Sequence, residues 1–405
     1  FGAAFDYTAP VDVFREYARL STLNNQGTRD FDIGSMSDLT DAAYESLQPV
    51  QWPQASGTNH ATTRFFANGK FYTPDQKARF ITVEAKASRV TSDELQFVLN
   101  TGRVRDHWHT MTRTASAARL SSHMAEPYCE IHPQDARSIG IANAELVEVS
   151  NPFGTITVRA LISDKAKPGS VFVPMHWTDQ FASQARVDSL VPARVDPFSG
   201  QPASKNVAVR VRRAKVGAYG FLVSSEKPDF KNRDILYWAT ARCDGGWRSE
   251  VAFASRRDAM RFGDSSAIDA NGNLALDYND PVTAGHRVAV FEAERLKLAV
   301  YLSNEPVLLA REWLVGQLGR SFENASDCQK VLAGRADAAM PDKGPVVCSC
   351  LGVGSYEILS AIHAGNITVQ EVGHCTGAGT NCGSCRAEIT GMINSHVQET
   401  KIAAE

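Results

Sequence analysis

The sequence lacks several features that would assign the chain to a broad class of proteins at once. No apolar run approaches the roughly 20 residues that a helix needs to cross a bilayer. Basic residues are not in excess, because 42 Lys and Arg stand against 45 Asp and Glu and the net charge is −3. This balance provides no electrostatic attraction to nucleic acid or to an anionic membrane. We therefore expect neither a nucleic-acid partner nor attachment to a membrane.

A secretion signal is also missing at the start of the sequence, which favours a cytoplasmic protein. The chain begins with Phe1 and not with methionine. We therefore expect a fragment of a longer protein, and for a fragment the missing signal is weak support for the location.

Cysteine is scarce over most of the chain. Cys129, Cys243 and Cys328 are isolated, and the other five cysteines lie between residues 348 and 385. A secreted protein held together by disulfides would be short and rich in cysteine throughout. Clustering near one end of a long chain favours a metal centre in a reducing compartment.

The distribution of residue types changes several times along the chain and indicates a multidomain protein. Irregular helical patches come first, then short β-rich segments with close turns that favour a closed β-barrel, then a mixed stretch, and finally the cysteine cluster. The predicted units are 1–90, an incomplete domain and connector; 91–214, the barrel; 215–333, an α+β domain of unclear role; 334–345, a linker; and 346–405, a small helical module.

Three local signals within these units predict particular structures. Alternating strands on either side of 151–154 are typical of a β-hairpin, and short aromatic runs around 68–69 indicate a second one. A proline near the start and a glycine at the end predict a helix over 306–319.

The cysteine cluster consists of two chelating pairs. "CSC" places Cys348 and Cys350 two positions apart, and "CGSC" brings Cys382 and Cys385 after 31 further residues. Both pairs are expected near helix N-termini, where backbone N–H groups stabilise a thiolate-rich centre. Four thiolates suit a [2Fe-2S] cluster or a structural zinc ion, and the tight C-x-C pair favours the cluster.

The segment "TGAGTNCG" before the second pair adds glycines and a fifth cysteine nearby, Cys375. No strand is predicted before it, so a dinucleotide-binding loop is not expected. We expect the glycines to let backbone N–H groups approach the sulfur atoms. Cys375 is expected to lie beside the centre without binding it.

Over about 50 residues, these spacings resemble the small helical [2Fe-2S] domain of bacterioferritin-associated ferredoxin (BFD). The same domain is appended to bacterial nitrite and assimilatory nitrate reductases. The resemblance implies that Cys348, Cys350, Cys382 and Cys385 are the cluster ligands.

A second chemically distinctive stretch, "LNTGRVRDHWHTMTRT", occupies 99–114. Thr101, Gly102 and Arg103 place a hydroxyl, an unhindered backbone and a cation at a strand end, which suits a phosphate. His107 and His109 would share one face if the strand continued, and could then hold a metal, although no third ligand is near. A polar loop without a ligand is the other interpretation.

The span 95–211 resembles the pterin-dinucleotide-binding domain of molybdenum enzymes, a double-psi β-barrel. Nitrate reductases and formate dehydrogenases belong to that family, and their cofactor is bis-molybdopterin guanine dinucleotide. "TGR…HWHT…TR", "EIHPQDA" and "GSVFVPMHW" carry the resemblance. The cofactor contacts that it implies are Thr101, Gly102, Arg103, His107, Trp108, His109, Thr110, Thr112, His176 and Lys205, with Met175 and Trp177 as alternatives to His176. Asp188 stands where other members often have asparagine, which leaves that contact open.

The two motifs together, with "QPVQWP" and "RFFANGKFYTPDQKARF", resemble the C-terminal half of bacterial assimilatory nitrate reductase catalytic subunits. The resemblance implies two-electron reduction of nitrate to nitrite at molybdenum. Electrons would come from a flavoprotein NAD(P)H-dependent reductase subunit or from ferredoxin. Residues 1–90 would then be a remnant of the main molybdopterin oxidoreductase domain.

The N-terminal half of such an enzyme is an expected partner, carrying a [4Fe-4S] cluster and the protein ligand to molybdenum. No C-x2-C-x3-C run is present here. We therefore assign no catalytic residue and expect no nitrate reduction by this chain alone. The alternatives are a formate dehydrogenase-like molybdenum oxidoreductase, a non-enzymatic iron–sulfur electron-transfer module, and a structural protein stabilised by a zinc ion.

Overall fold

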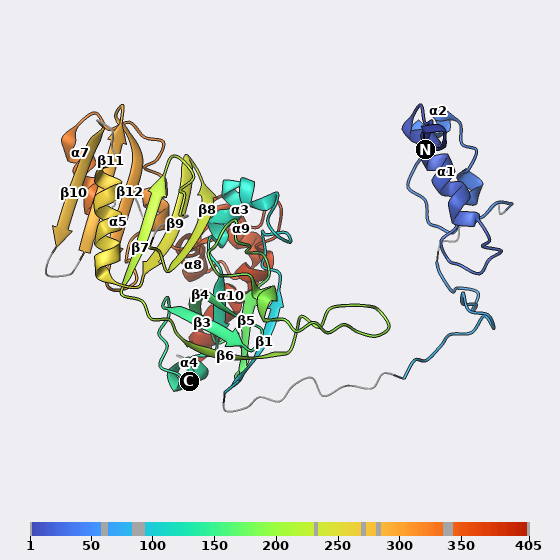
Figure 1. Ribbon diagram of the computed structural model, residues 1–405, viewed down its shortest axis with the longest axis horizontal. Helices are drawn as coiled ribbons and strands as arrows, with labels where there is room; N and C mark the ends of the chain where they lie inside the picture. The colour runs from blue at the N-terminus through green and yellow to red at the C-terminus, as the bar shows by residue number, and fades with distance from the viewer. Residues whose placement is uncertain are drawn as a thin grey trace. The chain divides into compact units, whose positions relative to one another are not determined.

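The computed structural model describes residues 2–57, 64–82, 94–230, 234–268, 273–280, 285–334 and 343–402. The chain divides into two compact units, Phe1–Lys86 and Ala87–Glu405. Figure 1 traces the elements of both units in chain order.

The first unit is small and helical. Its elements are η1 Gly2–Phe5, α1 Pro10–Thr22, η2 Gly34–Met36 and α2 Asp41–Glu45. Helix α1 begins with a proline, and its core contact Ala18 packs with Ile33 and Met36. The predicted hairpin at 68–69 is wrong: the segment 64–82 contains a turn, in which Gly69 N–H donates to the carbonyl of Phe66, but no strand. Phe66 stacks on Phe71 at 4.6 Å, so the aromatic side chains pack on one another across the turn.

A closed six-stranded barrel opens the second unit. Its strands are β1 Phe97–Gly102, β2 Tyr128–Ile131, β3 Leu146–Asn151, β4 Gly154–Ile162, β5 Ser170–Pro174 and β6 Val207–Arg213, in the order β1-β5-β2-β4-β3-β6. β1 runs parallel to β5 and β2 parallel to β4, and the other pairs are antiparallel. This barrel confirms the predicted fold class, and the hairpin at 151–154 is confirmed as the β3–β4 turn.

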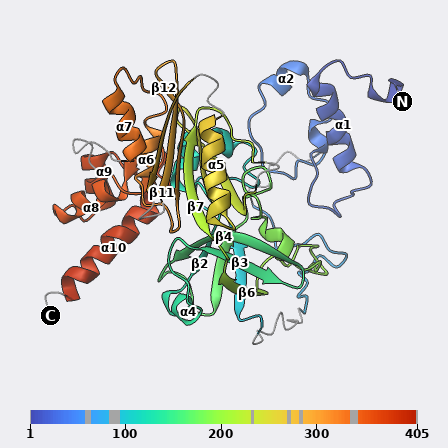
Figure 2. The same cartoon turned by 60° about the vertical axis from the view of Figure 1, so that its left-hand side comes forward.

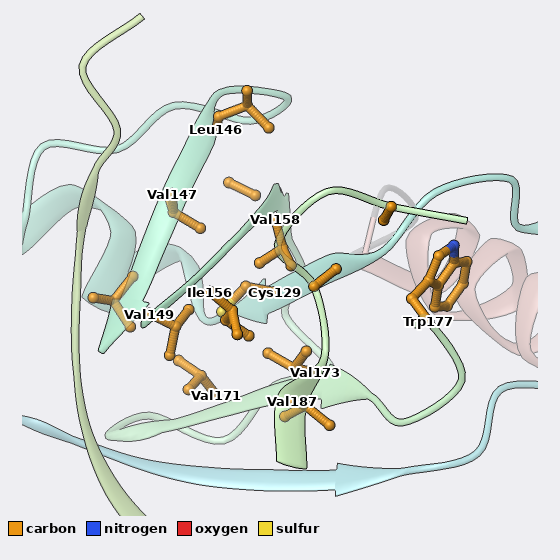
Figure 3. Close-up of a cluster of buried hydrophobic side chains, with 14 of the residues drawn as sticks. Cys129, Leu146, Val147, Val149, Ile156, Val158, Val171, Val173, Trp177 and Val187 are labelled. Atoms are coloured by element: carbon orange, nitrogen blue, oxygen red, sulfur yellow. The ribbon is translucent and has the colours of Figure 1, made fainter. Parts of the chain in front are cut away.

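Buried hydrophobic side chains fill the barrel, as Figure 3 shows. Val149, Ile156, Val158 and Val173 are among those that lie fully buried in its core. Trp177, just after β5, is also buried in this core. Between β1 and β2 the chain forms two short helices, η3 Thr114–Ser116 and α3 Ala118–His123, while α4 Pro133–Ser138 follows β2.

A six-stranded antiparallel sheet follows the barrel. Its strands are β7 Ala218–Ser224, β8 Tyr237–Cys243, β9 Gly246–Phe253, β10 Leu274–Asp280, β11 Gly285–Glu292 and β12 Arg295–Ser303, in the order β10-β11-β12-β7-β9-β8. Helix α5 Arg256–Ile268 covers one face, while α6 Arg311–Val315 and α7 Ala325–Ala333 cover the other (Figure 2). The domain is therefore α+β, as predicted.

The helix predicted over 306–319 is shorter than expected. Only Arg311–Val315 is α-helical. Nη1 of Arg311 donates to the carbonyls of Val307 at 3.0 Å and Leu309 at 3.2 Å. The arginine side chain thus takes the place of the amides that would have bonded these carbonyls in a helix.

A buried ion network joins the sheet to the barrel. Arg159 on β4 lies 3.1 Å from Glu126 and 3.5 Å from Glu250 on β9, and Arg311 lies 2.7 Å from the same Glu250. Removing one partner from such a network leaves an uncompensated buried charge, at a cost of about 3–5 kcal/mol. The network keeps the sheet against the barrel, where β8 also packs against α3. The sheet therefore supports the segment that follows β1.

The chain ends in a small helical module. Its elements are β13 Val346–Cys348, β14 Val353–Gly354, α8 Ser355–His363, α9 Val369–Thr376 and α10 Arg386–Ile402. At the start of α9, Thr368 accepts a hydrogen bond from the N–H of Glu371, whose carboxylate accepts one from the N–H of Thr368. None of the helices in the described parts of the chain has the length and apolar character needed to span a bilayer.

Candidate functional site

The loop that leaves β1 at residue 103 and reaches η3 is held in an unusual backbone conformation. Three of its non-glycine residues have left-handed φ angles, namely Asp106 at 72°, His109 at 42° and Met111 at 61°. Each such conformation costs of the order of 1–3 kcal/mol and persists only where neighbouring groups enforce it. Met111 is one of those anchors, because its side chain is buried in the barrel core.

His176, which follows β5, holds the same loop from inside. Its Nε2 accepts the N–H of Val104 at 2.9 Å, and its Nδ1 lies 2.7 Å from the carbonyl oxygen of His109. The ring therefore carries its proton on Nδ1 and donates it to that carbonyl. Burial lowers the pKa of His176, which favours this neutral form. Both ring nitrogens of His176 are bonded to the loop backbone. The contact between His176 and the cofactor stays a prediction.

His107 lies on the buried side of the loop. Its Nε2 lies 2.9 Å from the carbonyl oxygen of Met124, and its ring meets Trp177 edge-on at 5.4 Å. His109 is exposed. The condition for a shared face is not met, because the strand ends at Gly102 and His107 is buried whereas His109 is exposed.

The exposed side of the loop gathers most of the other predicted cofactor contacts. These are Arg103, Trp108, His109, Thr110 and Thr112. The guanidinium of Arg103 lies 4.4 Å from the ring centre of Trp108, which is 54% exposed. A cation stacked on an open indole provides a charge for a phosphate and a flat surface for a nucleobase.

The end of β1 provides a second feature that fits a bound group. The hydroxyl of Thr101 is buried and has no hydrogen-bond partner among the described residues. Lys205 donates to the backbone carbonyl of Thr101. A side chain at Gly102 would come within 3.4 Å of the Phe172 ring and 3.7 Å of Lys205 Nζ. Buried polar atoms normally have partners, so the orphaned hydroxyl of Thr101 fits a bound group that would form a hydrogen bond with it.

Both alternatives to His176 lie at the barrel core. Trp177 is buried in the barrel core and Met175 packs against it. Asp188 is exposed in the short helix η4 Val187–Leu190.

The four predicted cluster ligands lie together in the C-terminal module. Sγ of Cys350 lies 3.7 Å from Sγ of Cys348 and 3.5 Å from Sγ of Cys382, and Cys385 is hydrogen-bonded to Cys348. The thiols thus form a chain, and no group of three ligating side chains among the described residues is already arranged around a single ion. Cys348 and Cys385 are buried, whereas Cys382 is exposed. The centre therefore has an inner and an outer side.

Backbone N–H groups reach the sulfur atoms from the glycine-rich loop. Burial alone would raise the pKa of Cys348, but N–H groups of Gly379 and Leu351 and the neighbouring thiols lower it. Hydrogen bonds from Ser384 lower the pKa of Cys382, whereas burial raises the pKa of Cys385 to about 11. In each pair, the cysteine with the lowered pKa, Cys348 or Cys382, therefore loses its proton first. The donor set fits a cluster held by four thiolates.

The predicted positions near helix N-termini are correct for one pair only. Cys385 directly precedes α10, but Cys348 ends β13, and a turn and β14 separate it from α8. The N–H donors at the first pair therefore come from loops. Gly377, Gly379 and Gly383 all have φ near 75° to 80°, which explains the glycines in this loop.

Sequence reasoning missed the contact between the β1 loop and the C-terminal module. The side chains of Arg105 and Asp106 reach Glu388, Val347 and Ser349 of that module. Adjacent opposite charges in "VRDHWH" gave no signal of partners more than 200 residues away.

Family models match both parts of this arrangement. A molydopterin dinucleotide binding domain matches residues 97–208, and a BFD-like [2Fe-2S] binding domain matches residues 346–395. The chain therefore combines a molybdopterin-dinucleotide-binding barrel with a [2Fe-2S] domain, and the predicted resemblance is confirmed.

Among known proteins the chain is similar to nitrate reductases. A nitrate reductase of Klebsiella oxytoca is 33% identical over 97% of this chain and 44% of its own length. One from Shewanella frigidimarina is 26% identical over 95% of this chain, also 44% of its own. The assimilatory nitrate reductase catalytic subunit of Bacillus subtilis is 31% identical over 52% of this chain and 28% of its own. The chain thus spans less than half the length of these relatives.

A solved structure of acetylene hydratase from Pelobacter acetylenicus aligns with 30% of this chain and 18% of its own. The TM-score is 0.26 and the identity is 13%.

Proposed function

We propose that the chain is the C-terminal part of a molybdenum-dependent assimilatory nitrate reductase, which reduces nitrate to nitrite with two electrons. The observation that carries the proposal is similarity to nitrate reductases along nearly the entire chain, including both cofactor domains. A formate dehydrogenase subunit of Methanocaldococcus jannaschii is 28% identical but covers only 53% of this chain. Nitrate is therefore the favoured substrate.

The residues of the β1 loop have separate roles in this proposal. Thr101, Arg103 and Lys205 would hold phosphate or pterin oxygens, because they present a free hydroxyl and two cations. Trp108 would pack against the guanine. His107 and His176 would keep the loop in its strained conformation, because both are bonded to its backbone or to the chain beneath it.

The bound cofactor would supply molybdenum, which accepts an oxygen atom from nitrate; two electrons and two protons complete the conversion to nitrite and water. The four cysteines would hold the [2Fe-2S] cluster that passes electrons one at a time. The thiol of Cys382 is exposed. We expect the electron donor, a flavoprotein NAD(P)H-dependent reductase subunit or ferredoxin, to approach the cluster from that side. The remaining parts of the proposal are an N-terminal half with a [4Fe-4S] cluster and a cytoplasmic location.

The test has two stages. Purified chain should contain about two irons and two acid-labile sulfides per molecule, with a rhombic EPR signal after reduction. Zinc without iron would contradict the cluster. The chain, assembled with the segment that corresponds to the rest of the Klebsiella oxytoca relative, should then form nitrite from nitrate with a reduced viologen dye.

The competing functions give different results in the same assays. Formate oxidation without nitrate reduction would favour the formate dehydrogenase-like alternative. An electron-transfer module that is not part of an enzyme would keep its function when residues 91–214 are deleted, whereas a nitrate reductase would lose it.

A further inference from the structure

Arg105, in the loop that carries the predicted cofactor contacts, binds two separate parts of the iron–sulfur module. Its Nη1 lies 2.9 Å from Glu388 in the first turn of α10. Its Nη2 donates to the carbonyl of Val347 in β13 at 2.5 Å. Val347 directly precedes the predicted ligand Cys348, and Glu388 lies three residues after Cys385. One guanidinium therefore fixes the segments that carry both inner cysteines.

Asp106 completes this contact from the next position. Its Oδ2 lies 2.8 Å from Nε of Arg105 and 3.1 Å from Nδ1 of His123, and it accepts a hydrogen bond from the hydroxyl of Ser349 at 3.3 Å. The other ring nitrogen of His123 lies 3.5 Å from Glu388. Basic and acidic side chains thus alternate around a closed ring of contacts. We call this ring the module clamp, and its members are Arg105, Asp106, His123 and Glu388.

The module clamp is better shielded than an ordinary surface salt bridge. The side chains of Arg105, Asp106 and His123 are 19%, 7% and 14% exposed. Burial by itself would raise the pKa of Asp106, but His123 and Arg105 outweigh it and keep this pKa at about 2. Exposed pairs contribute little to stability, whereas shielded groups that share several partners are costly to separate.

We propose that Arg105 and Asp106 are positioning residues that clamp the [2Fe-2S] module onto the cofactor loop of the barrel. This inference rests on the proposed function only in assuming that the four cysteines hold a cluster. Cys348 and Cys385 are buried in the core of the module itself, whereas Cys382 is exposed. Arg119 reinforces the contact, because its Nη1 donates to the carbonyl of Cys350 at 3.3 Å.

The clamp charges also act on the cluster. Arg105 binds the carbonyl of Val347, the residue before Cys348, and Asp106 binds the hydroxyl of Ser349, the residue after it, so both charges are close to the centre. Reduction adds one negative charge to a [2Fe-2S] cluster, which a nearby cation favours and a nearby anion opposes. Loss of the Arg105 charge should lower the reduction potential, and loss of the Asp106 charge should raise it.

Hydrogen–deuterium exchange on the complete 405-residue chain tests the clamp. Arg105→Gln should increase exchange in both 104–112 and 386–394, because both segments lose a shared partner. Arg105→Lys should give an intermediate result, since an ammonium group keeps the charge but lacks the planar fork that binds Glu388 and Val347 together. Unchanged exchange in either segment would overturn the clamp.

The matched control is Arg212→Gln on β6. Arg212 forms an ion pair with Glu148 at 2.6 Å within the barrel, and its side chain is 61% exposed. This variant should leave exchange in both segments unaltered. If Arg105→Gln does not fold, Glu388→Gln removes the partner carboxylate from the module side and should give the same pattern of exchange.

Reduction potentials measured by EPR-monitored titration provide the second readout. Arg105→Gln and Asp106→Asn should shift the potential in opposite directions, with iron and sulfide content unchanged. Asparagine tolerates the left-handed φ at position 106. Shifts of the same sign, or none, would overturn the electrostatic role. A wild-type chain that binds no cluster would contradict the proposed function, and exchange would still test the clamp.

Discussion

The N–H of Val104 donates to Nε2 of His176, a residue 72 positions later in the chain. The same ring donates from Nδ1 to the carbonyl of His109, so that one buried side chain binds the loop backbone on both sides of Asp106, a residue with a left-handed φ angle. The exposed Arg103 and Trp108 are thereby presented in a defined orientation without being part of the core. Preorganisation of this kind lowers the entropy lost when a ligand binds.

Replacing His176 should therefore destabilise the loop and the barrel beneath it. In His176→Ala, the Val104 N–H and the His109 carbonyl both lose their partner, at about 1–3 kcal/mol for each group left unpaired. We expect a lower free energy of unfolding, measured with urea, and faster hydrogen exchange at 104–112.

His374→Ala provides the comparison for this variant. His374 is exposed on α9, and substitution there should change stability by no more than about 0.5 kcal/mol. Equal losses in the two variants would show that His176 has no special role in holding the loop.

Stability should also depend on pH through the buried histidines. Burial lowers the pKa of His107 and His176 below 6.5 in the folded chain. Below about pH 6.5 the unfolded chain binds protons that these folded residues do not, so their contribution is complete above that pH and is lost as the pH falls. Urea unfolding between pH 7.5 and 5 should show this decline, and His176→Gln should reduce its slope. An unchanged slope in the variant would contradict the assignment.

Much of the fold could be predicted from sequence because its signals are local. The turn at 151–154 and the capping box at Thr368 depend on residues a few positions apart, and both are present. The spacing of the cysteine pairs likewise brought four thiols together, since short chelating segments need only one long-range contact to meet. These features follow from backbone preferences and need little knowledge of the rest of the chain.

The features that sequence did not predict are set by distant partners. Arg105 meets Glu388 across 283 positions, and nothing near either residue indicates the other. The helix expected over 306–319 is shortened because Arg311 bonds the preceding carbonyls while pairing with Glu250 of β9. His107 is buried and His109 is exposed because tertiary packing, and not strand alternation, decides which side chain is buried.

The orphaned hydroxyl of Thr101 allows a substitution that should weaken cofactor binding without lowering the stability of the chain. Thr101→Val keeps the shape of the side chain but removes a buried group that has no partner among the described residues. We expect the free energy of unfolding of the chain alone to stay the same or to rise by up to about 1 kcal/mol, because an unpaired buried hydroxyl is unfavourable. Molybdopterin content of the assembled enzyme should fall. Thr110→Val, at an exposed position, is the control for stability; a large loss of stability in Thr101→Val would show that the hydroxyl already has a partner.

Substitutions of Cys375 and Cys382 distinguish a thiol that binds the cluster from one that only lies near it. Cys382 lies in the chain of sulfur contacts through Cys350, whereas the thiol of Cys375 lies 3.6 Å from the side-chain oxygen of Asn366. Cys382→Ala should abolish the visible absorption and EPR signal of a [2Fe-2S] cluster and reduce iron content, because only three protein thiolates remain. Cys375→Ala should keep about two irons and an unchanged EPR spectrum. The reverse pattern would reassign the ligands and make Cys375 part of the centre.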